Sequence, residues 1–294
     1  MASDASETTT PPGFDPRVTP ARPDLAALHL QGSVVADTFA SGQPMRVTVA
    51  IAPLSHAPDA DGEMASQLLF GEDFMAYEVE GGWAWGQSAT DDYVGYVPEV
   101  CLSPVPADAA APTHRVHAMQ ALIYPEPDLK ARPIGALPFG ARASVTEYQE
   151  AYAALDVGGW APMIALHPAA ESKPMWVSTA ERFKGVPYLW GGRSPAGIDC
   201  SGLIQAALHS AGYDCPRDSD QQMATVGREV SATGLKRGDI VFWKGHVGVM
   251  TSPTRLLHAN AHHMEVAEEA FETARSRIAE KEFGDIQMVR RITV

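Results

Sequence analysis

The spacing of apolar and polar residues changes character near residue 173. Beyond it, residues 199–211 place apolar side chains at helical spacing, and Gly212 follows as a stop signal. Residues 178–183 predict a shorter helix that begins with a Ser or Thr cap. Three β-rich segments come next, at residues 239–243, 246–250 and 255–259. A helix packed on an antiparallel sheet predicts an α+β domain over residues 173–294.

Ahead of that domain, short alternating segments are separated by glycine turns, and their order occurs twice. Residues 68–72 and 137–141 share the pattern Leu-x-Phe-Gly. Further on, residues 94–100 and 158–164 each contain Gly, an aromatic residue and then Pro. Short β-rich segments repeated in this order predict two small barrels. The alternative is a pair of unrelated β-hairpins in one larger β domain.

Two breaks rich in Pro and Ala divide the chain, at residues 103–112 and 167–171. Residues 1–12 are almost entirely small, polar or proline, so a disordered tail is expected there. The predicted organisation is therefore a lead-in segment with its tail at 1–40, a first barrel at 41–106, a second barrel at 113–168 and the α+β domain at 173–294.

Composition then excludes several classes of function. The chain has 294 residues, a mass of 31.4 kDa and a formal net charge of −14. Such an acid excess argues against nucleic acid or a membrane surface as a partner, because both attract clustered Lys and Arg. No apolar run is long enough to span a membrane. The sequence predicts nothing about the oligomeric state.

The cysteines and the N-terminal segment bear on the compartment. The chain has three cysteines, and an odd number at irregular spacing is no disulfide framework. Residues 1–12 lack the basic start and apolar run of a secretory signal. We therefore expect a cytoplasmic protein.

Cys200 stands at the first turn of the predicted helix, directly after Asp199. Backbone N–H groups and the helix dipole favour an anion at that place, so the pKa of the thiol is expected to fall. A thiolate is the form that attacks a carbonyl carbon. A buried core cysteine is the alternative. The polar flanks of Cys200 and the glycines at 191–192 favour the nucleophile.

Two histidines could serve as the base and its partner. His246 opens one predicted strand, where its ring could project towards the start of the helix, and His258 lies in the next strand. A hairpin would bring the two rings together. His246 would then accept the proton of Cys200, while His258 fixes the tautomer of His246. Asn260 is the alternative orienting group.

Five motifs that occur in order carry a family resemblance. They are Tyr-Leu-Trp-Gly-Gly at 188–192, Asp-Cys-Ser-Gly-Leu at 199–203, Arg-Gly-Asp-Ile-Val-Phe-Trp at 237–243, His-Val-Gly-Val at 246–249 and Leu-His-Ala at 257–259. This set resembles the NlpC family of papain-like cysteine peptidases, which cut stem peptides of bacterial peptidoglycan. The resemblance covers roughly residues 173–294. It implies Cys200 as the nucleophile, His246 as the base and His258 as the third polar residue.

The repeated β segments resemble bacterial SH3-like domains, and the whole layout resembles γ-D-glutamyl-L-diamino-acid endopeptidases. Members of that subgroup cut after D-glutamate in peptides whose N-terminal L-Ala is free. The resemblance implies that Asp199 and Ser201 read the free amine, that Tyr93 and Glu72 close over the substrate, and that Tyr188 lies near the oxyanion site. Asp199 could also be a helix cap, Tyr93 a barrel surface residue and Tyr188 a core residue.

Rival functions remain at this point. A zinc site is disfavoured because Cys200 and Cys215 are too far apart in sequence and His262 and His263 are adjacent, so no metal and no cofactor are expected. An inert binding module would be expected to have lost Cys200 or His246. An amidase or acyltransferase of the same fold, or a hydrolase of intact wall, stays open. The favoured hypothesis is a peptidase acting on small murein peptides, with diaminopimelate or lysine at the third position.

Overall fold

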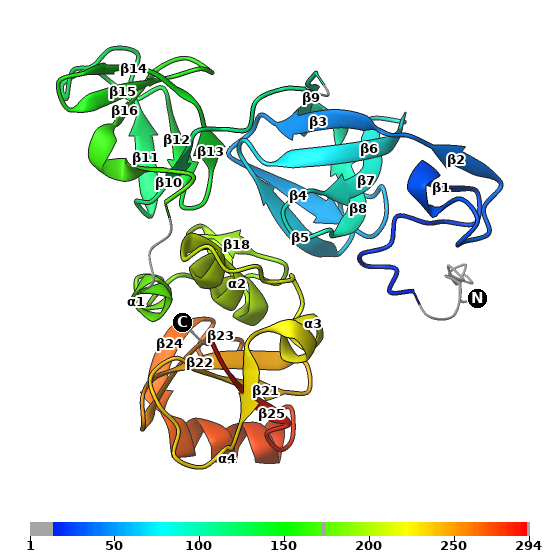
Figure 1. The fold of residues 1–294 in the computed structure, drawn as a ribbon. Coiled ribbons are helices and arrows are strands. Elements are labelled where there is room, and N and C mark those ends of the chain that lie inside the picture. The colour runs from blue at the N-terminus through cyan, green and yellow to red at the C-terminus, as the bar shows by residue number, and fades with distance from the viewer. Residues whose placement is uncertain (1–13, 107, 172–174, 293–294) are drawn as a thin grey trace. The chain divides into compact units, whose positions relative to one another are not determined.

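A computed structural model describes residues 14–106, 108–171 and 175–292, and the tail predicted for residues 1–12 lies outside them. The predicted α+β class is confirmed, with β-rich segments first and an α+β domain at the C-terminal end (Figure 1). The chain divides into two compact units, residues 1–110 and 111–294. Each unit is described below by itself.

The lead-in segment of the first unit has structure of its own. Strand β1 (Leu25–Ala27) pairs in parallel with β2 (Thr38–Ala40). The Arg22 guanidinium lies 4.4 Å from the ring centroid of Trp85 and forms an ion pair with Glu78 at 2.8 Å. Leu25 is buried against Trp85 and Val94. These contacts fasten the lead-in segment to the barrel that follows it.

The first barrel is a seven-stranded sheet in the order β5-β4-β8-β7-β6-β3-β9. Its buried core includes Leu54, Leu68 and Phe74. A 3-10 helix, Glu99–Cys101, leads into the last strand. The strands are β3 (Gln43–Val47), β4 (Ile51–Ser55), β5 (Met64–Leu69), β6 (Asp73–Glu80), β7 (Trp83–Ser88), β8 (Val94–Pro98) and β9 (Leu102–Pro104).

The second unit opens with a β-rich segment of three small sheets, in the orders β13-β10-β17, β11-β12 and β14-β15-β16. Two local features occur in both β-rich segments: a glycine at positive φ, Gly71 at 78° and Gly140 at 88°, and a 3-10 helix, Glu99–Cys101 and Met163–Ala165. The strands are β10 (His114–Val116), β11 (Gln120–Ile123), β12 (Gly135–Pro138), β13 (Arg142–Ala143), β14 (Val145–Gln149), β15 (Tyr152–Leu155), β16 (Trp160–Pro162) and β17 (Leu166–Pro168).

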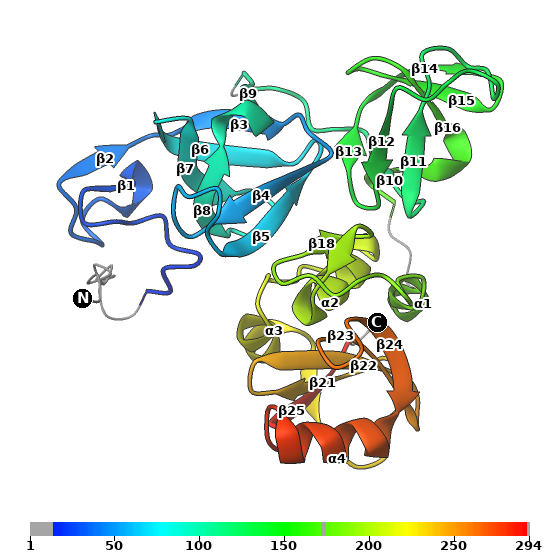
Figure 2. The ribbon, with the colours of Figure 1, turned by 180° about the vertical axis from the view of Figure 1, so that it is seen from behind.

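The C-terminal domain is built on a six-stranded sheet in the order β20-β25-β21-β22-β23-β24. Helix α2 covers one face of the sheet and α4 covers the other (Figures 1 and 2). The elements are α1 (Trp176–Glu181), β18 (Arg193–Ser194), β19 (Gly197–Ile198), α2 (Cys200–Ser210), α3 (Ser219–Thr225), β20 (Arg228–Val230), β21 (Asp239–Trp243), β22 (His246–Ser252), β23 (Arg255–Asn260), β24 (Glu265–Ala270), α4 (Phe271–Lys281) and β25 (Met288–Arg291).

The start of α1 differs from the prediction. The helix begins at Trp176, and its cap residue, Met175, makes no side-chain cap hydrogen bond. Ser178 and Thr179 lie inside the helix rather than at its cap, and the Ser178 hydroxyl accepts a hydrogen bond from Arg237. Burial of Trp176 among apolar neighbours starts the helix earlier than the Ser-Thr signal predicts.

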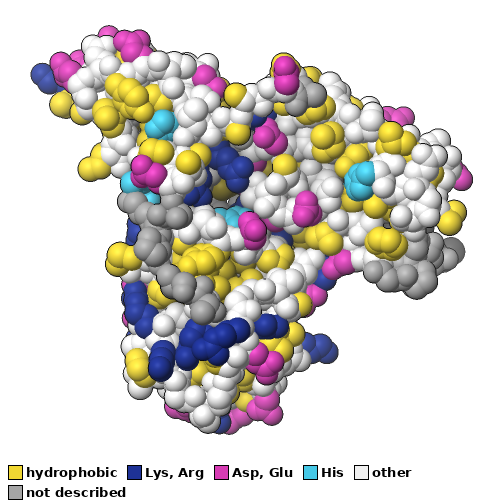
Figure 3. Space-filling model, viewed as in Figure 1, with side chains coloured by type: hydrophobic (Ala, Val, Ile, Leu, Met, Phe, Trp, Pro, Cys, Tyr) yellow, Lys and Arg dark blue, Asp and Glu magenta, His cyan; other side chains and the backbone are white. Residues whose placement is uncertain are grey.

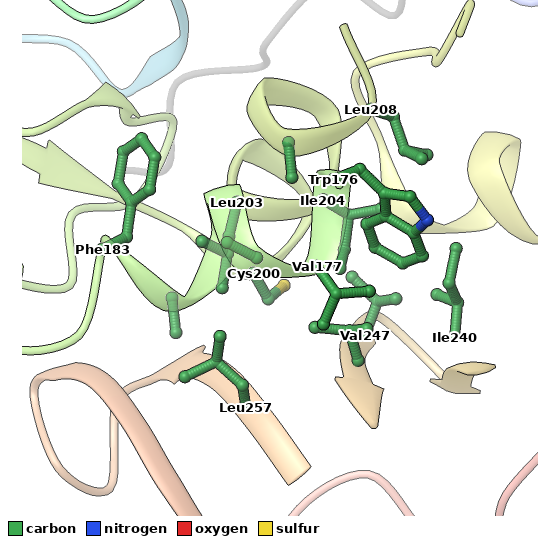
Figure 4. Packing of buried hydrophobic residues seen from close by; sticks show 14 of the residues in the cluster. Trp176, Val177, Phe183, Cys200, Leu203, Ile204, Leu208, Ile240, Val247 and Leu257 are labelled. Carbon is green, nitrogen blue, oxygen red and sulfur yellow. The ribbon is translucent and has the colours of Figure 1, made fainter. Parts of the chain in front are cut away.

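The core beneath α2 joins the helix to the sheet and to the preceding β-rich segment. Leu203, Ile204 and Leu208 pack with Val247 and Leu257 (Figure 4). Phe139 belongs to the same cluster, and its ring meets Phe183 edge-on at 5.4 Å. Burial of large apolar side chains is the main favourable term in such packing. The second β-rich segment is therefore packed against the C-terminal domain.

Charge is unevenly spread on the surface of the C-terminal domain. Lys and Arg side chains gather in a band across this domain on the face seen in Figure 3. Exposed arginines of the domain form ion pairs with carboxylates, as Arg237 does with Glu181 and Arg255 with Glu268. Within the described residues, no helix is both long and apolar enough to cross a membrane.

Candidate active site

The first turn of α2 is fixed by Asp199, which is its N-cap. Asp199 has an extended backbone, and its Oδ1 accepts a hydrogen bond from the Gly202 N–H at 2.7 Å. Such a cap satisfies one of the free N–H groups at the start of a helix. Helix α2 runs over Cys200–Ser210, one residue shorter at each end than the sequence predicts, and Gly212 follows it with φ at 79°. Cys200 is therefore the first residue of the helix.

A buried arginine holds the same carboxylate. Arg217 donates from Nη1 to Asp199 Oδ1 at 3.0 Å and from Nη2 to Oδ2 at 2.5 Å. The side chain of Arg217 is only 1% exposed. The Gly191 N–H donates to Oδ2 at 2.9 Å. Sequence reasoning missed Arg217, because no local pattern links it to a carboxylate 18 residues earlier.

The sulfur of Cys200 is buried against β22. The backbone N–H groups of Val247 and Ser201 stabilise its thiolate form, and so does the charge of Arg217. Burial and the charge of Asp199 act the other way and win, so the pKa of the Cys200 thiol is raised to about 12. The prediction of a lowered thiol pKa is therefore wrong, because desolvation outweighs the helix N-terminus. Cys200 rests as a neutral thiol.

The two histidines meet across neighbouring strands. His246 Nε2 and His258 Nδ1 are 2.8 Å apart, as expected for a hairpin that pairs β22 with β23. The His246 ring is stacked on Phe283 at 5.1 Å between centroids, with 12° between the planes. Burial lowers the pKa of both histidines, and that of His246 falls well below its usual value. Both imidazoles are therefore neutral at neutral pH.

Asn260 does not take the place beside His246. Its amide donates to the backbone carbonyl of His258, and its Oδ1 accepts from the backbone N–H of His263. The geometry thus gives the position next to His246 to His258 rather than to Asn260.

A carboxylate that sequence reasoning missed stands behind the histidines. Glu269 Oε1 lies 2.9 Å from His258 Nε2 and also accepts a hydrogen bond from Arg277 of α4. Arg277 pairs in addition with Glu282. Burial opposes ionisation of Glu269, but the hydrogen bond from His258 and the charge of Arg277 lower its pKa to about 2. The helical spacing of Phe271, Ala274 and Ile278 could have revealed α4, although not this contact.

Cys200 and His246, the predicted nucleophile and base, lie on α2 and β22, which pack together in one core. Within the described residues, no hydrogen bond joins the Cys200 thiol to either histidine ring, and the sulfur faces the N–H of Val247, the residue after His246. Catalytic hydrogen bonds are often long in a resting enzyme and shorten when substrate binds.

Two further predicted site residues, Ser201 and Tyr188, lie next to Cys200. The Ser201 hydroxyl donates to Asp199 Oδ1 at 3.3 Å and accepts from Arg217 Nη1 at 2.9 Å. The pKa of the Tyr188 hydroxyl is raised by burial and by the charges of Cys200 and Asp199. Tyr188 therefore keeps its proton and can donate a hydrogen bond close to the sulfur.

Glu72 and Tyr93 belong to the other unit. Glu72 is buried, and its Oε2 accepts from the Leu69 N–H at 2.9 Å across a turn. Tyr93 is part of the buried core of the first barrel rather than a barrel surface residue. The substrate-closing roles predicted for both residues stay predictions. As to metals, the described residues hold no group of three or more His, Cys, Asp or Glu side chains that could bind an ion.

Known protein families match one segment of the first unit and one segment of the C-terminal domain. Residues 185–282 match the NlpC/P60 family, and residues 54–101 match the bacterial dipeptidyl-peptidase SH3 domain. Over 91 residues the chain is 38% identical to the γ-D-glutamyl-L-lysine dipeptidyl-peptidase of Bacillus subtilis, covering 28% of this chain and 30% of the relative. Over 101 residues it is 36% identical to dipeptidyl-peptidase 6 of Lysinibacillus sphaericus, covering 34% of this chain and 37% of the relative. The chain thus spans about a third of the length of these relatives.

A solved structure extends the likeness in fold. An NlpC/P60 family protein from Bacillus cereus superposes with a TM-score of 0.71 over 84% of this chain and 99% of its own, at 19% identity. At that identity the likeness speaks for the fold alone. The sequence matches and this fold agree with the motifs around Cys200, His246 and His258. The chain therefore carries an NlpC/P60 family domain preceded by a bacterial SH3 domain.

Proposed function

We propose that this protein is a cysteine peptidase that cleaves the γ-D-glutamyl–diamino acid bond of murein peptides with a free N-terminal L-Ala. The observation that carries the proposal is that the Cys200 thiol, at the start of α2, faces the strand that begins with a hydrogen-bonded pair of histidines. The names of two relatives, a γ-D-glutamyl-L-lysine dipeptidyl-peptidase and a dipeptidyl-peptidase, support the bond and the free N-terminus.

The proposed reaction begins from a neutral thiol and a neutral imidazole. When substrate binds, the proton of Cys200 passes to His246 Nδ1 while the sulfur forms a bond to the γ-carbonyl carbon of D-glutamate. The carbonyl oxygen becomes an oxyanion, for which the Tyr188 hydroxyl is the proposed donor. Collapse of this intermediate breaks the C–N bond, and His246 returns its proton to the departing amine.

The second half of the reaction releases the acyl group. Water gives a proton to His246 and attacks the thioester carbon. The C–S bond breaks, and L-Ala-D-Glu leaves as the γ-carboxylic acid, which loses its proton to the solvent. The Cys200 thiolate then recovers the proton from His246, so both groups return to their neutral resting state.

The direct test is cleavage of L-Ala-γ-D-Glu-diaminopimelate, followed by mass spectrometry. We expect L-Ala-D-Glu and free diaminopimelate as products, and no product from Cys200→Ala. Cys215→Ala is the matched control, because Cys215 is the other buried cysteine of the domain, and it should retain activity. Cleavage that persists in Cys200→Ala would exclude the mechanism. Transfer of the acyl group to an added amine in preference to water would indicate an acyltransferase.

Recognition of the free amine is the finer part of the proposal. Asp199 and Ser201, which flank Cys200, are the residues proposed to read the amine. We expect acetylation of the substrate amine to reduce kcat/KM strongly, and Ser201→Ala to reduce that preference. Ser210→Ala, at the other end of α2, is the matched control. Equal cleavage of the free and acetylated peptides would contradict amine recognition.

We also propose that the substrate is a released peptide, which would place the enzyme in the recycling of murein peptides. The comparison is between the free tripeptide and purified intact peptidoglycan at equal peptide concentration. We expect cleavage of the tripeptide alone. Efficient solubilisation of intact peptidoglycan would point instead to a wall hydrolase.

A further inference from the structure

The hydrogen-bond chain behind His246 ends at a carboxylate whose task the proposed function does not explain. Resting on that proposed function, we propose that Glu269 is a positioning residue that selects the tautomers of His258 and His246. In the selected arrangement, Nδ1 of His246 carries no proton and can accept the one from Cys200. Glu269 acts through the two rings and does not touch the substrate.

Two neutral imidazoles joined by one N···N hydrogen bond have two possible arrangements. In one of them, His246 Nε2–H donates to His258 Nδ1, which leaves His246 Nδ1 bare. In the other, His258 Nδ1–H donates to His246 Nε2, which places the remaining proton of His246 on Nδ1. The second arrangement has no acceptor for the thiol proton. The distance of 2.8 Å between the rings fits both arrangements equally.

Glu269 breaks this symmetry from the far side of His258. An ionised carboxylate has only acceptor sites, so the contact of 2.9 Å requires that His258 Nε2 carry a proton. A neutral His258 then has a bare Nδ1, which must accept. His246 must therefore donate from Nε2, and its Nδ1 is left bare. One carboxylate thus fixes both rings in the productive arrangement.

The surroundings keep Glu269 ionised. The groups that face it are His258 from β23 and Arg277 from α4, and both lower the pKa of Glu269. Arg277 and His263 disfavour a positive charge on His258, which Glu269 favours. The His258 side chain is fully buried, while those of Glu269 and Arg277 are 14% and 12% exposed. Water therefore has little access to replace the carboxylate at His258.

The same carboxylate balances the charge that forms during catalysis. Once Cys200 has lost its proton, His246 is an imidazolium that still donates from Nε2 to His258. Glu269 stabilises that positive charge through the neutral His258 ring, and no proton moves to Glu269. Removing the carboxylate should therefore have two separable effects, one on the tautomers and one on the charge.

Nitrogen-15 NMR of the histidine side chains tests the tautomers without any need for activity. In the wild-type protein at neutral pH, we expect both histidines to carry their proton on Nε2. The proposal is overturned if His246 in the wild type carries its proton on Nδ1. In Glu269→Met, which removes the acceptor, we expect a second tautomer to appear for both rings. Unchanged tautomers in a folded Glu269→Met protein would also overturn it.

Two further variants separate charge from tautomer and from general damage to the sheet. Glu269→Gln keeps an acceptor oxygen beside His258 but loses the charge, so it should retain the wild-type tautomers. Glu268→Met makes the same kind of change one residue earlier in β24, where the carboxylate contacts Thr251 and Lys184. It should leave the tautomers and the activity unchanged.

Kinetics on the murein tripeptide supply the second readout. We expect Glu269→Met to lose about 10²–10⁴-fold in kcat, the range that a correctly placed base contributes. We expect Glu269→Gln to lose roughly tenfold and to move the acid limb of the pH profile to lower pH, because the imidazolium has lost its counter-charge. An equal loss in Glu268→Met, or an unmoved acid limb in Glu269→Gln, contradicts the positioning role. If the wild type cleaves no peptide, the NMR result still decides the tautomers, and only the proposed function fails.

Discussion

Two carboxylate–arginine pairs stand on either side of the proposed catalytic groups, and they differ in what their carboxylates do. Asp199 and Arg217 hold the start of α2, while Glu269 and Arg277 stand behind the histidines. Asp199 accepts hydrogen bonds from Gly191, Ser201, Gly202 and both terminal nitrogens of Arg217. Glu269 directs one oxygen, Oε1, to both His258 and Arg277.

This difference indicates a structural role for Asp199 and an electrostatic role for Glu269. A carboxylate surrounded by backbone donors and a bidentate arginine has its charge balanced locally, so it mainly fixes geometry. For Asp199 that geometry is the first turn of α2 and the place of Cys200. Glu269 has fewer partners, and one of them is the His258 ring. His258 in turn contacts His246, which is proposed to gain a positive charge during the reaction. We therefore expect the Asp199–Arg217 pair to contribute more to the stability of the fold. The Glu269–Arg277 pair should have the larger effect on the protonation of the two histidines.

Removing each arginine is the strongest test of this contrast. Arg217→Met leaves Asp199 as an uncompensated buried charge and should cost about 3–5 kcal/mol in the free energy of unfolding. Arg277→Met leaves Glu269 bonded to His258 and should cost less than the loss of Arg217. Urea unfolding of both variants gives the comparison. Adding Asp199→Asn to Arg217→Met should recover part of the loss, and equal costs for the two arginines would remove the distinction.

A smaller change tests how tightly the first turn of α2 is packed. Gly202 lies in the first turn of α2, where a Cβ would stand 2.3 Å from the Gly192 carbonyl oxygen and 3.0 Å from Asp199 Oδ1. Ala favours helices over Gly by about 1 kcal/mol, but overpacking against backbone costs about 1–3 kcal/mol. We expect Gly202→Ala to be less stable than the wild type, with a lower midpoint temperature in thermal unfolding. Gly284→Ala is a control for a glycine with no atom near its Cβ position, although its φ of 77° adds some strain of its own.

Much of the fold follows from local patterns in the sequence. The apolar face of residues 199–211 gives α2 to within a residue at each end, since the cap at Asp199 and the stop at Gly212 are local signals. The β segments around His246 and His258 are also local patterns, and their hairpin explains why the rings meet. The start of α1 escaped prediction because burial of Trp176 in the tertiary core overrode the Ser-Thr signal.

The site was predictable only as far as its motifs reach. Cys200, His246 and His258 stand in short motifs, but Arg217 and Glu269 reach their partners through tertiary contacts. The resting state of the thiol depends on desolvation, which a helix position alone does not reveal. Local sequence thus points to the proposed reacting groups, and the fold supplies the groups that set their protonation.

The histidine side of the contrast should appear in the pH dependence of stability. The pKa of His246 and of His258 is lower in the folded protein than the usual 6.5, so the unfolded chain binds more protons as the pH falls below 6.5. Stability should therefore fall with pH in that window, by at most about 1.4 kcal/mol per pH unit for each histidine. The pKa of Glu269 is lowered from 4.5 to about 2, so its contribution is present above pH 4.5 and is lost as the pH approaches 2. Urea unfolding at several pH values should show a shallower slope below pH 6.5 for His258→Gln and a shallower slope below pH 4.5 for Glu269→Gln. A His258→Gln protein with the wild-type slope between pH 6.5 and 5 would show that the fold does not hold this histidine neutral. The electrostatic role that distinguishes Glu269 from Asp199 would then be contradicted.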